Sequence, residues 1–433
     1  MTAATRRTLL TKVALALLPF VAVGCRGVPA KDAADARPSG AAPIEMFSWI
    51  ERIGDSDPLG ALAAVHRRRY PQDEIINARA ALSGLARKTL RGRMLRNEPP
   101  DTFQANVGFD LMQWVLTNGS DARESKLVPL DGIGVDTTWR GAMPAPLVDR
   151  LSYDGRPYAI PANMQRNNMI FYNKQLLAKH GLVEPKSIDD LVAMGNKLRE
   201  AGVPLLGVGS REAWTVSLLV FECLFVAREG SDVYRDYFKG NLTADDPRIV
   251  RTLEAALRLF AYANPDHRNL SWQQAVELVV DGKAAMTVMG DWARGPFAAR
   301  GMKVGVDYGQ APFPGTANAF VFSSDAFALP IGAKNPAGVL RLLATLASVE
   351  GQRAISEARA SLSARVDVPP PASDEVLGAN YLLLKEGKVV NALSGLVPPA
   401  FGDDVSASLL EMLDLNDVDP VVHTLRSRYA LLH

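Results

Sequence analysis

The chain has 433 residues, of which 48 are basic and 47 acidic, so its formal charge of +1 provides no field that would favour nucleic acid. Its 48% apolar and 22% charged residues are typical of a globular protein, and its length favours two domains or lobes. Only five histidines occur, no two of them at ligand spacing, so we expect no metal site and no cofactor.

The first 24 residues are organised like an export signal. A basic segment with Arg6, Arg7 and Lys12 precedes the apolar run 13–23, which is too short to span a membrane. Cys25 follows Val-Gly, an arrangement that resembles the lipobox of bacterial lipoproteins, with Cys25 as the acylated residue. A soluble export signal that happens to contain a cysteine is the alternative.

The next segment, residues 25–43, is rich in alanine, glycine and proline and has no apolar periodicity, which predicts a flexible tether. A signal at 1–24 followed by such a tether predicts a protein of the cell envelope. We expect it in the periplasm or otherwise outside the cytoplasm, anchored to the membrane through Cys25.

From residue 44 onward, short apolar strands alternate with amphipathic helices, which predicts an α/β protein. The expected strands include Ile44–Trp49, Val203–Val208 and Ala284–Met289. The expected helices include Leu59–Arg69 and Pro336–Ser348. Ser187 and Asp190 form a capping-box pattern at the start of another helix.

The stretch Tyr158–Lys174 has the composition of a hinge. Tyr158–Pro161 is extended, because the residue before a proline is pushed out of the helical region. The polar run Asn163–Asn168 follows, and then Met169–Tyr172 has strand character. These residues favour either a crossing between lobes beside a ligand crevice or an ordinary strand–loop–strand.

A second stretch of the same kind occurs at Phe320–Pro330. Two separated crossings predict lobes assembled from discontinuous pieces, which can open and close by hinge rotation. With this second crossing, the first stretch is predicted to be a lobe crossing, with Pro161 marking the point where the chain leaves the first lobe.

Asp291 and Trp292 follow the expected strand Ala284–Met289 directly. A carboxylate and an indole at the carboxyl end of a strand are typical of residues that face a ligand. Asp291 as the N-cap of a helix from Trp292 to Arg300 is the other interpretation, and the two are compatible.

Five segments of the chain, in order, resemble extracellular solute-binding protein family 1. The resemblance is to sugar ABC-transporter proteins of the glucose/mannose-binding branch, in the superfamily that includes maltose-binding protein. The segments are Asn97–Gln104, Ile160–Arg166, Phe171–Lys174, Gly282–Gly295 and Pro312–Thr316. Each is weakly specific alone, and their ordered combination carries the resemblance.

The resemblance implies a two-lobed periplasmic-binding-protein type II fold, with discontinuous lobes joined by a hinge and the ligand in the cleft between them. We expect lobe 1 at residues 44–158 and 325–355, and lobe 2 at residues 162–320 and 360–433. The implied function is that of the substrate-binding lipoprotein of a carbohydrate ABC importer. Such a protein binds a mono- or small oligosaccharide and delivers it to the transmembrane permease subunits, and we expect it to act as a monomer and not as an enzyme.

The chain departs from the family pattern at expected ligand positions. Trp49 is followed by isoleucine where the family has a second tryptophan, and Asp55 stands near the position of a glutamate. Gln165 and Leu393 each stand where the family has histidine, and Arg359 where it has lysine. Because one charge-assisted hydrogen bond is worth about 1.5–3 kcal/mol, these changes make glucose itself a doubtful ligand.

A hexose has apolar faces and polar edges, so its site needs aromatic rings and hydrogen-bonding groups. We expect the rings to come from three tryptophans, at least one of which instead packs in the core. The predicted ligand-binding residues are Trp49, Asp55, Gln104, Gln165, Trp214, Asp291, Trp292 and Arg359.

Two rival functions remain open at this point. One is a secreted glycoside hydrolase that pairs Asp291 with Asp55 or Asp325. The other is a sugar-sensing or scaffold lipoprotein that no longer takes part in transport.

Overall fold

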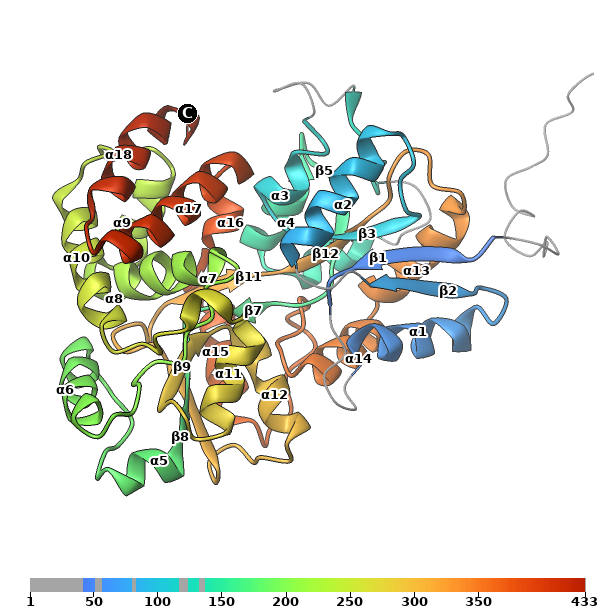
Figure 1. The fold of residues 1–433 in the computed structure, drawn as a ribbon. Helices are drawn as coiled ribbons and strands as arrows, with labels where there is room; N and C mark the ends of the chain where they lie inside the picture. The colour runs from blue at the N-terminus through green and yellow to red at the C-terminus, as the bar shows by residue number, and fades with distance from the viewer. Residues whose placement is uncertain (1–41, 51–56, 80–82, 117–123, 132–136, 433) are drawn as a thin grey trace, which may run out of the picture. The chain divides into compact units, whose positions relative to one another are not determined.

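The computed structural model describes residues 42–50, 57–79, 83–116, 124–131 and 137–432. The predicted export signal, Cys25, most of the predicted tether and Asp55 therefore lie outside the described residues. Strands and helices follow one another through the described part of the chain (Figure 1). No helix within it is long and apolar enough to cross a membrane.

The first lobe is built on a mixed sheet whose described strands run in the order β2-β1-β3-β12-β6. The first three are parallel, whereas β12 is antiparallel to both of its neighbours. Figure 1 shows α1 and α14 below this sheet and α2, α3 and α4 above it, and α13 contacts both α1 and α14. The bounds are β1 Ile44–Ser48, α1 Pro58–Arg69, β2 Ile75–Arg79, α2 Ser83–Leu95, β3 Thr102–Asn106, α3 Phe109–Met112, α4 Ala145–Leu151, β6 Ala159–Pro161, β12 Asp325–Ala328, α13 Pro336–Ala347 and α14 Val349–Arg359.

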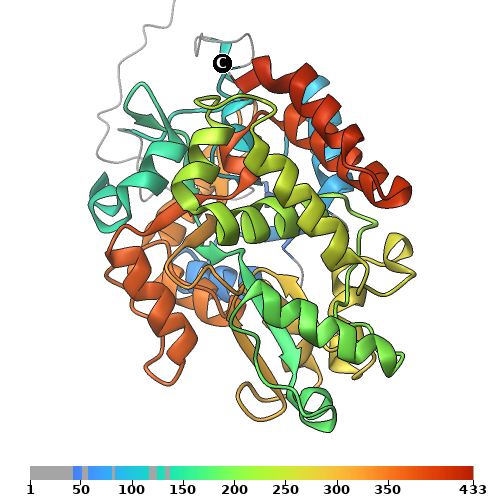
Figure 2. The ribbon, with the colours of Figure 1, turned by 90° about the vertical axis from the view of Figure 1, so that its left-hand side faces the viewer.

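The second lobe contains an antiparallel sheet with β8 between β10 and β9, surrounded by helices. Helix α17 lies beside α7 and α10, and its antiparallel neighbour α18 follows it (Figures 1 and 2). The bounds are β8 Met169–Asn173, α5 Lys174–Lys179, α6 Ile188–Glu200, α7 Trp214–Ser217, π-helix η3 Leu218–Phe225, α8 Val226–Glu229, α9 Ser231–Phe238, α10 Pro247–Phe260, α11 Trp272–Val280, β9 Met286–Met289, α12 Arg294–Ala299, β10 Tyr308–Pro312, α16 Leu393–Leu396, α17 Pro399–Leu415 and α18 Asp419–Arg428.

A small sheet of the order β13-β11-β7 joins the lobes. It consists of β7 Gln165–Arg166, β11 Phe320–Ser323 and β13 Val389–Asn391. Strand β7 connects the first lobe's β6 to the second lobe's β8, and β11 runs directly into the first lobe's β12. The hinge is therefore made where segments distant in sequence pair with one another.

Two separate hydrophobic clusters form the cores of the lobes. The second cluster is centred on apolar residues of η3, and Phe221 and Phe225 each contact further aromatic rings there. The expected boundaries of lobe 2 differ from these clusters in both of its segments. Ala162, Met164 and Phe320, at the two ends of the expected segment 162–320, lie in the first cluster. Residues 360–433 were assigned to lobe 2, but Leu362, Leu377 and Leu384 pack in the first cluster, the latter two from α15 Glu375–Lys385.

The predicted position of the first crossing is wrong by a few residues. Tyr158 and Ile160 are buried in the first core, and Pro161 pairs with Ala326 inside the first lobe's sheet. The crossing begins after Pro161, because Gln165 and Arg166 are the residues that pair with β11 instead. The extended conformation predicted for Tyr158–Pro161 is correct, but it belongs to a strand of the first lobe.

Most of the expected elements are confirmed. Strand Met169–Asn173, helix Pro336–Ala347 and the capping box at Ser187 are all present. The expected strand Val203–Val208 is wrong, since only Leu206 forms isolated bridges there. The backbone groups next to Leu206 bond to Met286 of β9, where the Gly207 N–H donates to the Met286 oxygen at 2.7 Å and the Met286 N–H donates to the Leu205 oxygen at 2.9 Å. The Val208 N–H donates to the Asn264 side chain at 2.7 Å.

Arg166 anchors the hinge from inside the protein. Its side chain is almost completely buried, and burial lowers its pKa to about 10. The guanidinium donates to the Asn380 side chain at 2.7 Å and to the backbone oxygens of Thr316 and Ala319, each at 2.7 Å. One side chain on β7 therefore holds the loop before β11 and helix α15.

We expect the replacement Arg166→Met to lower the free energy of unfolding by at least about 3 kcal/mol. It leaves three buried acceptors without a charged donor, and hydrogen bonds to charged groups contribute roughly 1.5–3 kcal/mol each. Urea unfolding measures the effect, with the exposed Arg353→Met as the matched control. Equal stability of the two variants would contradict this role for Arg166.

Candidate functional site

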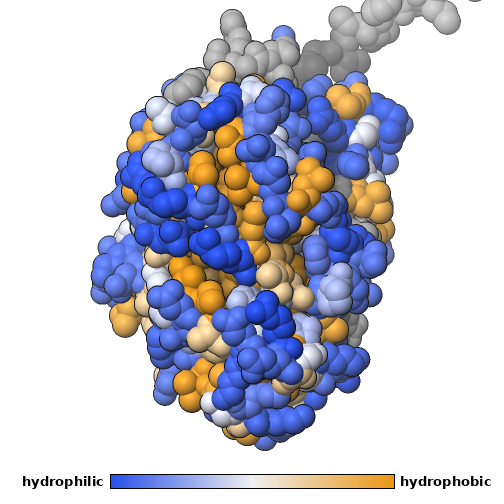
Figure 3. All heavy atoms as spheres, turned by 60° about the vertical axis from the view of Figure 1, so that its left-hand side comes forward, coloured by the Kyte–Doolittle hydropathy of each residue, from blue (hydrophilic) through white to orange (hydrophobic). Residues whose placement is uncertain are grey.

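The candidate site is a cavity of about 230 Å³ between the two lobes. On the face drawn in Figure 3, hydrophobic side chains gather along the middle of a mostly hydrophilic surface. The residues that line the cavity come from both lobes and from the hinge. They are Trp49, Arg87, Asn106, Asp110, Gln165, Asn167, Glu212, Trp214, Ser217, Leu218, Glu222, Trp272, Gln273, Trp292, Ser323, Asp325, Arg359, Leu393, Ser394, Val397, Pro398, Pro399, Gly402, Asp403 and Ser406.

The first lobe presents residues at the carboxyl ends of its parallel strands, where open α/β sheets place ligands. Trp49 directly follows β1, and Asn106 ends β3. Gln104 lies behind them, fully buried, and does not line the cavity. The side-chain oxygen of Gln104 accepts from the backbone N–H of Trp49 at 2.9 Å, and its side-chain amide N–H donates to the Asp325 carboxylate at 2.6 Å. Gln104 thus positions two lining residues.

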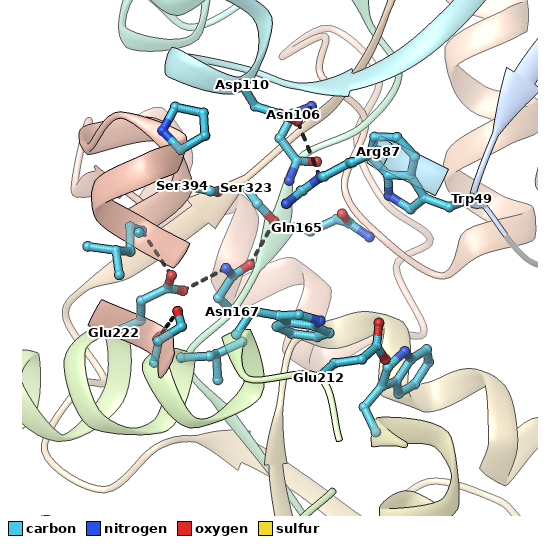
Figure 4. A pocket seen from close by; sticks show the side chains of 18 of the residues that line it. Trp49, Arg87, Asn106, Asp110, Gln165, Asn167, Glu212, Glu222, Ser323 and Ser394 are labelled. Atoms are coloured by element: carbon cyan, nitrogen blue, oxygen red, sulfur yellow. Dashed lines mark hydrogen bonds and ion pairs between the residues drawn. The ribbon is translucent and has the colours of Figure 1, made fainter. Parts of the chain in front are cut away.

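Asp325 is a charged group at the start of β12 that faces the cavity. Besides Gln104, it accepts from the Asn163 amide at 3.1 Å and lies 3.1 Å from the Arg359 guanidinium. Arg87 occupies the opposite end of the first lobe's wall. Its guanidinium lies over the Trp49 ring at 5.4 Å, and its Nε is 3.7 Å from the Asp110 carboxylate (Figure 4).

A hydrogen-bonded chain forms the hinge side of the cavity (Figure 4). The Ser323 hydroxyl donates to the side-chain oxygen of Asn167 at 2.8 Å, and the side-chain amide N–H of Asn167 donates to the Glu222 carboxyl group at 2.7 Å. Glu222 also accepts from the backbone N–H of Leu393 at 2.9 Å. Because Glu222 is buried among the apolar residues of η3, burial raises the pKa of its carboxyl group.

The second lobe supplies an aromatic wall. Trp214, Trp272 and Trp292 are each partly buried, packing against the second core with one part and lining the cavity with another. The ring centroids of Trp214 and Trp292 lie 6.3 Å apart at an interplanar angle of 54°. The Trp214 Nε1–H is buried and has no hydrogen-bond partner among the described residues.

Trp292 is held in place by the absence of a side chain at Gly290. A Cβ atom at that position would overlap the Cζ3, Cη2 and Cε3 atoms of the Trp292 ring. The backbone at Gly290 is ordinary extended chain, with φ −70°, so the requirement for glycine is steric. The indole of Trp292 therefore lies directly on the backbone that leaves β9.

Asp291 does not line the cavity, and it does not cap the following helix. Its Oδ2 accepts from the backbone N–H of Arg166 at 3.0 Å, while its Oδ1 has no partner among the described residues. No side-chain hydrogen bond caps the 3-10 helix η5, Asp291–Ala293, that precedes α12. Both interpretations made from sequence are thus replaced by a third, in which Asp291 ties the second lobe to β7.

Of the eight predicted ligand residues, the structure brings five to the cavity: Trp49, Gln165, Trp214, Trp292 and Arg359. Gln104 and Asp291 lie behind its wall, and Asp55 is outside the described residues. The expectation that at least one of the three tryptophans is a core residue is wrong, since all three are partly exposed to the cavity.

Sequence reasoning missed Glu222, Arg87, Asn167 and the lining residues between Ser394 and Ser406. Leu393, which stands at a family histidine position, also lines the cavity. A signal for Glu222 was available, because it is the one charged residue in the apolar run Leu218–Phe225. Arg87 belongs to a run of basic residues on α2, a pattern that by itself is typical of a solvated helix face. For α16 and α17 no local pattern marks which residues meet the other lobe.

Comparisons with known proteins agree on one family. The model described as "bacterial extracellular solute-binding protein" matches residues 88–353. An uncharacterized ABC transporter extracellular-binding protein of Pyrococcus horikoshii is 33% identical over 385 residues, which cover 87% of this chain and 85% of the relative. A probable sugar-binding periplasmic protein of Brucella suis is 30% identical over 296 residues, 67% of each chain.

Solved structures share the fold at low sequence identity. The bacterial solute receptor AcbH, which has an exclusive substrate preference for β-D-galactopyranose, superposes with a TM-score of 0.77 at 17% identity. The match covers 90% of this chain and 98% of AcbH. The GacH receptor of Streptomyces glaucescens has a TM-score of 0.67 at 19% identity, over 90% and 98% of the two chains. The predicted two-lobed α/β fold of type II is thereby confirmed.

The burial of Asp291 generates a prediction about stability and pH. Burial raises the pKa of Asp291 from 3.8 to about 7. A carboxyl group with a raised folded-state pKa stabilises the fold at low pH. This contribution is lost as the pH rises from about 4 through about 7, by on the order of 4 kcal/mol.

We therefore expect Asp291→Asn to be more stable than the parent protein at pH 8, with a smaller difference at pH 5. The amide keeps the acceptor for Arg166 N–H and removes the buried charge. Urea unfolding at both pH values measures this, with the exposed Asp189→Asn as control. Parallel pH profiles for parent and Asp291→Asn would contradict the assignment.

Proposed function

This chain belongs to the family of bacterial extracellular solute-binding proteins, and we propose that it is the substrate-binding component of a carbohydrate ABC importer. The observation that carries the proposal is the cleft itself. Partly exposed tryptophans from both lobes face hydrogen-bonding side chains in one cavity. Sugars need this combination, because their C–H faces pack on indole rings and their hydroxyls bond to carboxylates and amides.

The size of the cavity and the names of relatives support a small saccharide. A volume of about 230 Å³ lies below the usual range for ligand pockets, roughly 300–1,000 Å³, and therefore suits a small ligand. The Brucella relative carries the description of a sugar-binding protein, and AcbH prefers a monosaccharide. A sugar that contacts both lobes stabilises the closed form of the protein. The closed form then docks on the transmembrane permease subunits.

The sequence-derived features complete the proposal. We assign residues 1–24 as the export signal and Cys25 as the acylated residue, so that the monomeric protein stays at the membrane surface near its permease. We place the lobes at residues 44–164 with 320–384, and at residues 165–319 with 389–432, because Met164, Phe320 and Phe322 pack in the first hydrophobic cluster. The hydrolase alternative is not supported, because Asp291 does not line the cavity and Asp325 lies 3.1 Å from Arg359.

A thermal-shift screen of mono- and disaccharides tests the proposal. At a hundred times its dissociation constant, a ligand that binds only the folded state stabilises it by about 2.7 kcal/mol, which raises Tm measurably. We expect at least one sugar to do so. If amino acids or peptides raise the Tm and no sugar does, the carbohydrate assignment is overturned. If the rise in Tm disappears with time because the sugar is consumed, the protein is an enzyme.

The role of the aromatic wall has its own test. We expect Gly290→Ala to displace the Trp292 ring and to weaken binding of whichever sugar the screen identifies by roughly fivefold, or about 1 kcal/mol. Gly141→Ala is the control, because its added Cβ meets no atom within 4 Å. Calorimetric titration measures both affinities, and an unchanged affinity in Gly290→Ala would exclude Trp292 from the sugar site.

A further inference from the structure

The small sheet that joins the lobes is bonded to one carboxyl group. Glu222 accepts from the side-chain amide of Asn167, the residue after β7, at 2.7 Å. It also accepts from the backbone N–H of Leu393, just beyond β13, at 2.9 Å. Asn167 in turn accepts from the hydroxyl of Ser323, the last residue of β11, at 2.8 Å. Glu222 is thus linked to the chain at each of the three strands of this sheet.

The side-chain bonds of Glu222 act on the same residues as the backbone bonds of the sheet. The backbone N–H of Asn167 donates to the Val321 oxygen on β11 at 2.8 Å. The backbone N–H of Ala392 donates to the Phe322 oxygen on β11 at 2.7 Å. A displacement of Asn167 or Leu393 relative to Glu222 would therefore strain the pairing of all three strands.

The carboxyl group itself is fixed to the second lobe. Glu222 lies in the π-helix η3, whose residues are all buried and whose apolar side chains form the centre of the second core. Helices of this kind are rare and occur frequently at functional sites. Burial raises the pKa of Glu222, and the bonds from Asn167 and the Leu393 N–H act against that rise. A buried polar group without such partners would destabilise the fold, so the carboxyl group and its two donors hold one another in place.

The members of this hydrogen-bonded chain also line the candidate site. Ser323, Asn167, Glu222 and Leu393 all border the cavity. Figure 4 shows Ser323, Asn167 and Glu222 following one another along one side of the pocket. The same side chains therefore connect the joining sheet to the second core and form part of the surface that a ligand meets. A change in the orientation of the sheet relative to η3 would change the shape of the cavity.

From this arrangement we propose that Glu222 is the positioning residue of the hinge. Its carboxyl group holds β7, β11 and β13 in one orientation relative to the second core, and it thereby keeps the cavity in the shape that binds the ligand. A cavity that is already ordered binds more tightly, because less conformational freedom is lost on binding. This role requires that Glu222 accept or exchange two hydrogen bonds, and it does not require a charge.

Two substitutions separate hydrogen bonding from charge. In Glu222→Gln the new amide oxygen can accept from the Leu393 N–H, and the new amide N–H can donate to Asn167 once the Asn167 amide turns over. The turned amide then donates to the Ser323 hydroxyl, so every link is kept. Glu222→Met has a similar length but no strong acceptor, so the Asn167 amide and the Leu393 N–H lose their partner. The matched control is Leu219→Met, a change of similar volume at a buried residue of η3 that does not line the cavity.

Amide hydrogen exchange of the full chain without ligand measures the hinge directly. The segments to compare are 164–168, 320–324 and 389–396, which contain the three strands of the joining sheet. We expect Glu222→Met to exchange about tenfold faster than the parent protein in all three segments together, because the sheet opens more easily. Strands β1 and β3 of the first lobe and β8 and β9 of the second should keep the parent's rates. Glu222→Gln and Leu219→Met should stay within about twofold of the parent throughout.

Sugar binding provides the second measurement, and this part of the inference rests on the proposed function. Calorimetric titration uses D-glucose, D-galactose and D-mannose as probes. For each probe that binds the parent protein, we expect Glu222→Met to bind about tenfold more weakly and Glu222→Gln to stay within about threefold. If Glu222→Gln loses as much affinity as Glu222→Met, the charge of Glu222 is what the sugar requires and the positioning role is wrong.

The exchange pattern decides between coupling and a local effect. Faster exchange in Glu222→Met that is confined to the segment around Leu393 would show a local bond only and would overturn the inference. Equal acceleration of β8 and β9 would mean that the whole second lobe is loosened, which also overturns it. If none of the three sugars binds the parent protein, the exchange pattern still decides the role of Glu222, whereas the wider sugar screen decides the proposed function.

Discussion

The carboxylate of Asp325 is the constraint on which the arrangement of the two lobes depends. It lies at the first residue of β12, immediately after the second crossing, and it accepts hydrogen bonds from Gln104 on β3 and from Asn163 on the first crossing. The Asp325 backbone N–H returns a bond to the Asn163 side chain at 3.1 Å. A buried charge is tolerated only when it is paired and hydrogen-bonded, so these partners must stay together.

The same bonds connect the frame of the protein to its cleft. Gln104 holds both Asp325 and the backbone of Trp49, and Arg359 completes the charge balance from the end of α14. Across the hinge, Arg166 and Asn167 bond to the second lobe in a similar way. Fully bonded polar residues thus fix the two crossings, and the cavity forms where these crossings bring the ends of elements from both lobes together.

Three of the positions at which the chain departs from its family lie on the cavity. Gln165, Arg359 and Leu393 replace residues that the family resemblance implies, and all three line the site. Leu393 also contributes a backbone N–H to Glu222, a function that its side chain does not determine. The departures change side chains that line the cavity, while the fold that presents them is retained.

The sequence by itself determined the α/β class, the family and most elements, because periodicity, capping residues and short ordered motifs are local properties of the chain. It also identified the two crossings, although it placed the first a few residues early. Which side chains face the cavity was decided by tertiary structure alone. Gln104 and Asp291 lie in family motifs, yet long-range hydrogen bonds to Asp325 and Arg166 turn them away from the ligand. Glu222, Arg87 and α17 reach the site because two separately formed cores meet there, and no local pattern encodes that meeting.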